Sequence, residues 1–229
     1  MNVLIVIAHP EPKSMNHAMA AAMQDQFEAR GWSVAVSDLY AQRFRAAPSS
    51  ADFRMLHDPV RFSLAHEQRL AQHSDGYRCD IQYQHKALRA ADLVVFQFPL
   101  WWYAVPAILK GWVERVFGKG FAYDDTHMFE TGLLRGKRAL LSITTGGTRA
   151  ELDADAVHTG SVEQFLKPFT GGVLAFSGIE VEEPFIAYAV GGMGQPEHDQ
   201  VLAALRARVD RLAADMERLP SVDSPRQAA

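Results

Sequence analysis

The sequence predicts an α/β protein built on a doubly wound, mainly parallel sheet with helices on both faces. Short apolar runs alternate with segments of helical periodicity, which is typical of successive strand–helix units. The first run, residues 3–8, is apolar throughout, as expected of a central strand that is buried on both faces. A chain of 229 residues that is 48% hydrophobic and 22% charged suits one such domain.

The predicted elements follow in order along the chain. Apolar runs predict five strands, at 3–8, 33–39, 93–98, 138–144 and 179–183. Helical spacing predicts helices at about 15–30, 80–90, 106–117, 162–169 and 195–218. Gly31 stands where a glycine typically ends the first helix. Five strands with intervening helices fit either of the common doubly wound strand orders.

Two segments lie outside this alternation. Residues of about 41–78 contain scattered aromatic side chains, Pro48 and Pro59 with little periodicity, so we expect an excursion with short helical turns. Residues 221–229 are polar and without pattern. We therefore expect a single domain over 1–220, followed by a disordered tail.

Composition and charge argue against several functional classes. Lys and Arg number 23 against 27 Asp and Glu, and the net charge of −4 argues against nucleic acid as the main ligand. Cys79 is the single cysteine, so no intramolecular disulfide and no cysteine-rich metal site are possible. The apolar start has no basic n-region, and no apolar run approaches the roughly 20 residues of a membrane span. We therefore expect a cytoplasmic protein without membrane insertion and without a bound metal.

In a doubly wound sheet, ligands bind beyond the carboxyl ends of the strands, so the loops after the first, third and fourth strands matter most. The first loop, residues 9–16, leads into a helix N-terminus, where backbone N–H groups favour a phosphate. His9, Lys13, Ser14 and Asn16 can add charge or hydrogen-bond donors to it. The loop is not a G-x-G-x-x-G motif, and an ordinary turn capped by Ser14 fits the same residues.

The loop after the third strand, Pro99-Leu-Trp-Trp-Tyr103, carries three consecutive aromatic residues. Loops run over the surface, so large rings placed there cost solvation free energy unless something stacks on them. A planar aromatic cofactor would supply that partner. The alternative is that the rings pack against the excursion or against a second subunit.

The loop after the fourth strand contains Thr144, Thr145, Gly146 and Gly147. Adjacent glycines let the backbone approach a ligand closely, and their N–H groups can stabilise the negative charge that develops on a flavin's pyrimidine ring as it is reduced. His158 follows in a polar stretch and can change charge near neutral pH, which suits a group that stabilises a transient anion. An ordinary turn and a surface histidine are the alternatives.

Together these loops resemble the NAD(P)H:quinone oxidoreductase family, the DT-diaphorase type of flavodoxin-like quinone reductases. The resemblance runs from about Val3 to about Pro184, and its longest blocks read AADLVVFQFPL, VPAILKGWVERVF and LSITTGG. It implies a flavodoxin-like fold with strand order 2-1-3-4-5. It also implies bound FAD, with FMN as the alternative, and a two-electron, ping-pong hydride transfer from NAD(P)H through the flavin to a quinone. Finally, it implies a homodimer whose sites are shared across the interface.

The resemblance also assigns roles to individual positions. The cofactor-binding residues it implies are His9, Lys13, Met15, Asn16, Pro99, Leu100, Trp101, Trp102, Tyr103, Glu114, Thr144, Thr145, Gly146 and Gly147. The catalytic residues it implies are His158, Gly146 and Gly147. The substrate cavity would contain Trp102, Tyr123, Asp125, Met128 and Phe176. Glu114 matches a residue contributed across the dimer, at the adenosine end of the cofactor.

Three positions depart from the family pattern. Leu152 stands where the better-known members have a tyrosine that shares a charge relay with the histidine. Asp125 replaces a cavity tyrosine, and Trp101 replaces a glutamine. A two-residue relay is therefore not expected here, although His158 alone could still act.

Other functions fit the same loops. Relatives with these flavin loops serve as ancillary regulatory subunits of potassium efflux systems, but they are without the excursion at 41–78. A one-electron carrier of the flavodoxin kind would be more acidic and would have fewer bulky aromatic residues in its loops. The natural acceptor is open as well, since quinones, azo dyes and nitro compounds all fit a flat cavity.

Overall fold

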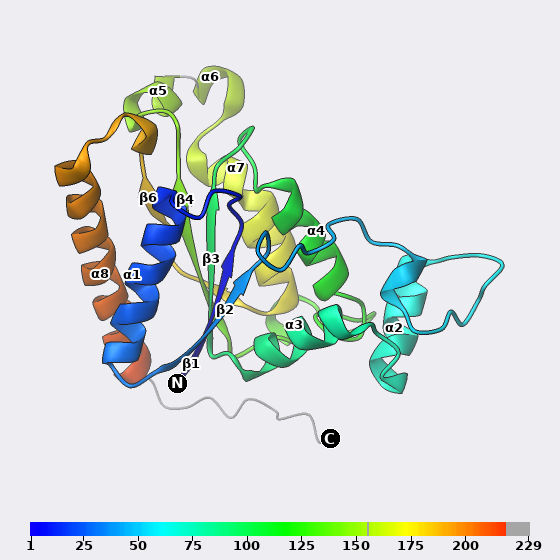
Figure 1. The fold of residues 1–229 in the computed structure, drawn as a ribbon. Coiled ribbons are helices and arrows are strands. Elements are labelled where there is room, and N and C mark those ends of the chain that lie inside the picture. Colours follow the sequence, from blue (N-terminus) through cyan, green and yellow to red (C-terminus); the bar gives the residue numbers. More distant parts are fainter. Residues whose placement is uncertain (155, 219–229) are drawn as a thin grey trace.

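The computed structural model describes residues 1–154 and 156–218 of the chain. Its sheet has the strand order β2-β1-β3-β4-β5, with every neighbouring pair parallel, and β6 pairs with β4 as well. The strands are β1 (Asn2–Ile7), β2 (Ser33–Asp38), β3 (Leu93–Pro99), β4 (Arg138–Thr144), β5 (Glu180–Val181) and β6 (Phe185–Ala187). The predicted doubly wound fold and strand order are confirmed (Figure 1). The prediction for the tail at 221–229 lies outside the described residues.

The fifth strand differs in detail from the prediction of one strand at 179–183. β5 pairs with the first residues of β4, and β6 pairs with its last three. Pro184 lies between the two short strands. A proline has no N–H to donate to a sheet ladder, and this explains why the strand is interrupted there.

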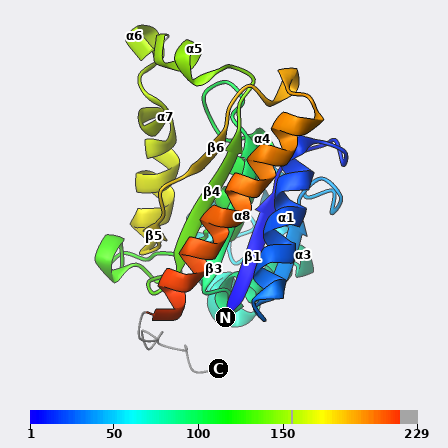
Figure 2. The ribbon, with the colours of Figure 1, turned by 90° about the vertical axis from the view of Figure 1, so that its left-hand side faces the viewer.

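The helices cover both faces of the sheet because the strand residues point alternately to each side. Along β1, Leu4 and Val6 pack in one core cluster, while Val3 and Ile5 pack in the other. The first cluster lies under α3 (Cys79–Ala90), α4 (Ala107–Val116) and α7 (Val162–Phe169). The second lies under α1 (Met15–Ala29) and α8 (Gln195–Arg218), which run side by side in Figure 2. All five predicted helices are therefore present.

The excursion contains more helix than the sequence predicted. It has one 3₁₀ turn (Ser50–Asp52) and an eleven-residue helix, α2 (Leu64–Ser74), which extends away from the sheet (Figure 1). A small core of its own, which includes Phe53, Tyr77 and Ile81, packs under α2. This separate core explains why the periodicity of the segment is weak: few of its positions face the main sheet.

Arg115 of α4 ties the excursion to the rest of the domain. Its side chain is fully buried and donates to the backbone oxygen of Arg45 at 2.9 Å and to the carboxylate of Asp80 at 2.6 Å. It also lies 3.1 Å from the carboxylate of Asp52, which is 1% exposed and also pairs with Arg45. A buried charge is tolerated only when it is paired, so Arg115 and Asp52 depend on each other.

Among the described residues, no helix has both the length and the apolar character needed to cross a membrane.

Candidate functional site

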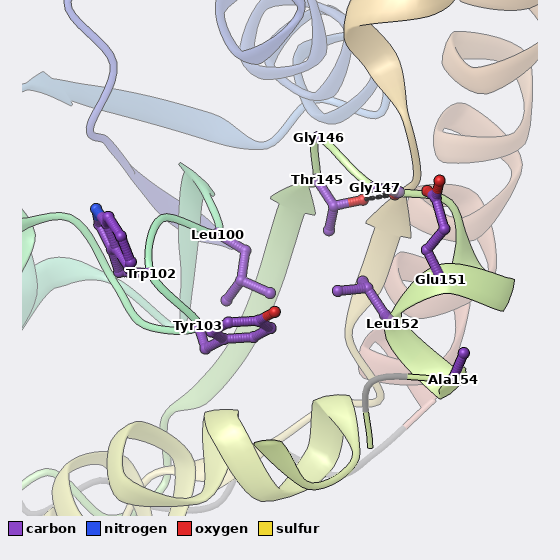
Figure 3. Close-up of a pocket in the computed structure, with 9 residues that line it drawn as sticks. All are labelled: Leu100, Trp102, Tyr103, Thr145, Gly146, Gly147, Glu151, Leu152 and Ala154. Atoms are coloured by element: carbon purple, nitrogen blue, oxygen red, sulfur yellow. Dashed lines mark hydrogen bonds between the residues drawn. The ribbon is translucent and has the colours of Figure 1, made fainter. Parts of the chain in front are cut away.

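The loops after β3 and β4 meet at the carboxyl edge of the sheet and enclose a cavity of about 520 Å³. Two short helices not predicted from the sequence, α5 (Arg149–Ala154) and α6 (Ala156–Thr159), follow β4, and α5 forms one side of the cavity (Figure 3). The lining residues are Leu100, Trp102, Tyr103, Thr145, Gly146, Gly147, Glu151, Leu152 and Ala154. A volume of this size is in the range of cofactor and small-molecule sites.

The aromatic loop after β3 forms a tight, strained turn. The N–H of Trp101 donates to the oxygen of Ala104 at 3.2 Å, and the N–H of Ala104 donates back at 3.0 Å. The two residues between them, Trp102 and Tyr103, have φ angles of 52° and 56°. Such turns usually contain Asn-Gly, because bulky side chains disfavour positive φ. Strain kept in this way is typical of ligand sites, and it turns Trp102 outward with 95% of its surface exposed.

We expect that replacing Trp102-Tyr103 by Asn-Gly stabilises the flavin-free protein by about 1 kcal/mol, because both positions then accept positive φ without strain. Part of the gain is offset by losing the edge-on contact of Tyr103 with Phe165 at 5.0 Å. The same change should weaken flavin binding at least about tenfold, a loss of roughly 1.4 kcal/mol. Denaturant unfolding and flavin titration measure the two effects.

Arg43 offers a matched control for this prediction. It also has a positive φ, 49°, but it is exposed and does not line the cavity. Arg43→Gly should raise stability and leave flavin affinity unchanged. If the Asn-Gly variant binds flavin as well as the native turn does, the rings of this loop are not part of the cofactor site.

The loop after β4 presents backbone donors to the cavity. Thr145 fixes it: its N–H donates to Ala187 of β6 at 2.9 Å, and its hydroxyl donates to the oxygen of Gly147 at 2.7 Å. Within the part of the chain that the structure describes, the N–H groups of Gly146 and Gly147 donate to no protein acceptor. A side-chain carbon added at Gly146 would meet no atom within 4 Å. The loop therefore offers two free N–H groups beside open space, as a ligand with carbonyl oxygens requires.

The first loop contacts the aromatic loop through His9. Its ring lies 5.9 Å from the ring of Trp101, and its Nδ1 accepts a hydrogen bond from the N–H of Glu11 at 3.1 Å. Burial lowers the pKa of His9. Nδ1 also lies 3.3 Å from the backbone oxygen of Glu11; in the tautomer in which Nδ1 accepts from Glu11, the proton is on Nε2 and can be donated to a ligand. Lys13 is exposed, whereas Met15 packs against the core and can offer only its backbone N–H at the start of α1.

A second histidine, His17, lies beside this loop, and the sequence indicated no role for it. Its ring nitrogens lie 3.2 Å from the hydroxyl of Ser14 and 3.2 Å from the carboxylate of Asp38. The backbone N–H of His17 donates to the same hydroxyl, so Ser14 caps α1, as the alternative interpretation of this loop proposed. The contact of His17 with Asp38 depends on the pairing of β1 with β2, and sequence spacing does not reveal that pairing.

Asn16 has a structural role that the sequence did not reveal. Its side chain is 3% exposed, donates to the hydroxyl of Thr144 at 2.9 Å and accepts from Gln97 of β3 at 2.8 Å. The amide therefore links the first loop to β3 and β4 below the cavity. One hydrogen of the side-chain NH2 group has no protein acceptor among these contacts, so donation to a phosphate stays a prediction.

The predicted catalytic histidine lies apart from the cavity walls. His158 is exposed on α6 and does not line the cavity, whereas Leu152 does, with its side chain pointing toward Leu100 and Tyr103 (Figure 3). Glu151 also lines the cavity and was missed from the sequence, because a glutamate near a helix start is most often a capping residue.

The remaining predicted residues lie elsewhere on the chain. Tyr123 and Phe129 pack on Phe176, each at 5.3 Å between ring centres. Next to Phe176, the oxygen of Ser177 accepts from Leu134, just before β4 and β5 begin. This places Tyr123 and Phe176 at the amino edge of the sheet, opposite the cavity, and Asp125 and Met128 are exposed in the same loop.

Glu114 is likewise remote from the cavity. It is exposed on α4, where it pairs with Lys110 at 2.5 Å. A single chain therefore does not bring Glu114 and the predicted substrate-binding residues of the 123–128 loop together with the residues that line the cavity. Over the described ranges, no group of three or more histidine, cysteine or acidic side chains could hold a metal ion.

The fold and the site define a flavodoxin-like protein. A sequence model of the family described as "Flavodoxin-like fold" matches residues 1–212. The match covers all the strands and all but the last turns of α8.

Relatives place the chain more narrowly. NAD(P)H dehydrogenase [quinone] 1 of Cavia porcellus is 40% identical over 210 residues, which are 91% of this chain and 76% of that protein. Ribosyldihydronicotinamide dehydrogenase [quinone] of Homo sapiens is 41% identical over 211 residues, 92% of this chain and 91% of the other. A crystal structure from Klebsiella pneumoniae matches with a TM-score of 0.86 at 34% identity, over 93% of this chain and 85% of that one. The chain belongs to the NAD(P)H:quinone oxidoreductase family that its sequence resembles.

Proposed function

We propose that this chain is a flavin-dependent NAD(P)H:quinone oxidoreductase that transfers two electrons as a hydride from NAD(P)H to quinones. One observation carries the proposal: the free N–H groups of Gly146 and Gly147 border the same cavity as the exposed ring of Trp102. A flat ligand with carbonyl oxygens along one edge fits both features. Membership of a family whose members are named for this reaction supports the assignment.

The residues present fit a flavin. The open space at Gly146 can accept the edge of a ring system, and the turn at Trp102 and Tyr103 can border its face. The N-terminus of α1, with His9 and Lys13 beside it, suits the phosphates of the cofactor. When bound, the flavin supplies the hydride-accepting and hydride-donating chemistry. We propose FAD rather than FMN, because the excursion and Glu114 match the adenosine-binding parts of the family.

The protein contributes positioning and electrostatics. The Gly146 and Gly147 N–H groups border the cavity and would stabilise negative charge that develops on a flavin held there. Leu100, Tyr103 and Leu152 give an apolar surface that excludes water from one side of the cavity. The cavity would hold NAD(P)H and then the quinone at one place beside the flavin, which lowers the entropic part of the activation barrier for hydride transfer. The proposed role of His158, stabilising a transient anion without the tyrosine that Leu152 replaces, would require His158 to approach the cavity that it does not line here.

We further propose a cytoplasmic homodimer that uses ping-pong kinetics. Tyr123, Met128 and Phe176 lie at the opposite edge of the sheet from Trp102 within one chain. The family resemblance nevertheless places all four around one substrate. A second copy that presents its Tyr123 loop to the cavity of the first would account for both the positions within one chain and the shared substrate cavity. The same second copy would contribute Glu114.

The proposal is tested by identifying the cofactor and following its turnover. Protein loaded with flavin should release FAD on heating, as identified by chromatography, and NAD(P)H should bleach it. Added menadione should restore the colour within the turnover time, and light scattering should give the mass of two chains. Protein that stays colourless with both FAD and FMN would contradict the assignment, as would a bleached flavin that quinones cannot reoxidise.

A further inference from the structure

Glu151 gives the cavity a negative charge. Of the nine residues with described positions that line the cavity, it is the one that is ionised at neutral pH. It lies in the first turn of α5, and in Figure 3 its carboxylate lies at the Gly147 end of the cavity. A side-chain carbon added at Gly147 would lie 3.5 Å from one oxygen of this carboxylate. The charge therefore borders the backbone donors described above.

The position of this charge is fixed by Thr148. The Glu151 carboxylate accepts from the Thr148 N–H at 2.7 Å and from its hydroxyl at 2.9 Å, while the Glu151 N–H donates back to that hydroxyl at 3.2 Å. This is a reciprocal helix cap. The hydrogen bonds from Thr148 also lower the pKa of Glu151, so the carboxylate stays ionised throughout the neutral range.

Among the described residues, Glu151 has no ion-pair partner, and the nearest arginine in the sequence is already paired. Arg149 is 3.7 Å from Asp153 in an exposed pair, and neither residue lines the cavity. Leu100 and Tyr103 line the other side of the cavity, and Leu152, which follows Glu151 on α5, points toward them. An acceptor that binds beside the flavin in this cavity therefore comes close to a carboxylate that pairs with no described cation.

We propose that Glu151 is a specificity-determining residue that makes the enzyme discriminate against anionic acceptors and favour neutral or cationic flat ones. The inference rests on the proposed function, since it names the class of acceptor that this cavity takes. A unit charge some 5–8 Å from a charged substituent in an open, solvated site changes binding by about threefold to tenfold, and salt screens the effect.

The test uses Glu151→Gln, because glutamine keeps the cap with Thr148 and removes only the charge. The flavin-loaded protein is reduced photochemically, so that the reaction with NAD(P)H does not enter. Reoxidation is then followed by stopped flow with 1,4-naphthoquinone-2-sulfonate, which is anionic, and with menadione, which is neutral. The ratio of the anionic to the neutral rate constant should rise about threefold to tenfold in the variant, and the rise should shrink at about 0.5 M salt.

Asp153→Asn is the matched control, because it removes an equal charge from the same helix at a position that does not line the cavity. Its ratio should equal that of the native protein. A binding measurement without turnover repeats the comparison: naphthalene-2-sulfonate should bind the oxidised Glu151→Gln protein more tightly than the native protein, relative to the neutral naphthalene-2-sulfonamide.

The outcomes separate this inference from the proposed function. Reoxidation by menadione with an unchanged ratio in Glu151→Gln would overturn the selectivity and leave the quinone reductase assignment intact. An equal change in Asp153→Asn would overturn it too, since the effect would then belong to the overall charge of α5. Failure of native protein to bind flavin or to be reoxidised by menadione would instead refute the proposed function.

Discussion

Gly146→Val should abolish useful flavin binding while leaving the flavin-free fold intact. A carbon added at Gly146 meets no protein atom within 4 Å, and the φ angle of this residue is not positive, so the substitution strains nothing in the chain. The valine side chain would instead occupy the cavity beside the free N–H groups. We expect the flavin dissociation constant to rise at least about 100-fold, or roughly 2.7 kcal/mol. Titration followed by flavin fluorescence measures the change.

Gly172→Val is the control for this prediction. Gly172 lies in the helical segment Thr170–Leu174, is exposed, and also has no atom within 4 Å of an added carbon, but it does not line the cavity. Its variant should bind flavin like the native chain. The free energy of unfolding of both variants should lie within about 0.5 kcal/mol of that of the native protein, as is usual for substitutions away from the core. Unchanged flavin affinity in Gly146→Val would remove the β4 loop from the cofactor site.

The fold could be predicted because its strands are buried on both faces. A strand such as 93–99 is apolar for nearly its whole length, and this pattern is typical of a central parallel strand. The short strand β6 after Pro184 was missed, since an edge strand that pairs on one side has a weaker pattern. The helix α2 was missed for a related reason: it packs on its own small core, so its apolar positions face Phe53 and Tyr77 and not the sheet.

The types and approximate positions of the site residues could be predicted from the sequence, but the contacts that they make could not. Aromatic residues and glycines at strand ends indicated Trp102 and Gly146, because those residue types are costly there without a ligand, and both line the cavity. Asn16 was assigned to the ligand, yet it bonds to Gln97 and Thr144. Three residues separated by up to 128 positions meet there, and only the strand order brings them together. Polar residues near a site can serve either the ligand or the protein, and sequence alone does not distinguish the two.

The predicted substrate residues lie at two opposite edges of the sheet, and this too depends on the path of the chain, which sequence spacing does not reveal. Tyr123 and Trp102 are close in sequence, but α4 lies between them and carries the chain from the carboxyl edge back to the amino edge. One helix of ten residues spans about 15 Å at 1.5 Å per residue. Proximity in sequence therefore suggests one cavity, whereas the path of the chain places Tyr123 at the opposite edge of the sheet, and the proposed second copy would complete the cavity. The excursion is anchored on that same helix, through Arg115.

Arg115→Leu should lower the free energy of unfolding by about 3–5 kcal/mol, the usual cost of removing one partner from a buried ion pair. Asp52 would remain 1% exposed with only the half-exposed Arg45 as its cationic partner, and the backbone oxygen of Arg45 would lose its donor. Because the Arg115 side chain anchors the excursion, the backbone N–H groups of α2 should be the first to lose protection from hydrogen exchange. Urea unfolding at several protein concentrations measures the change and separates it from subunit dissociation.

Arg54→Leu shows how much of that loss belongs to burial. Arg54 lies in the same excursion and pairs with Asp75 at 3.3 Å, but the two side chains are 53% and 76% exposed. An exposed pair contributes at most about 1 kcal/mol, so this variant should remain close to native stability. Adding Asp52→Asn to the Arg115→Leu variant should recover part of the loss, because it removes the unpaired buried charge. If both arginine variants cost the same, or if the added Asp52→Asn change recovers nothing, then packing and not the buried ion pair holds the excursion in place.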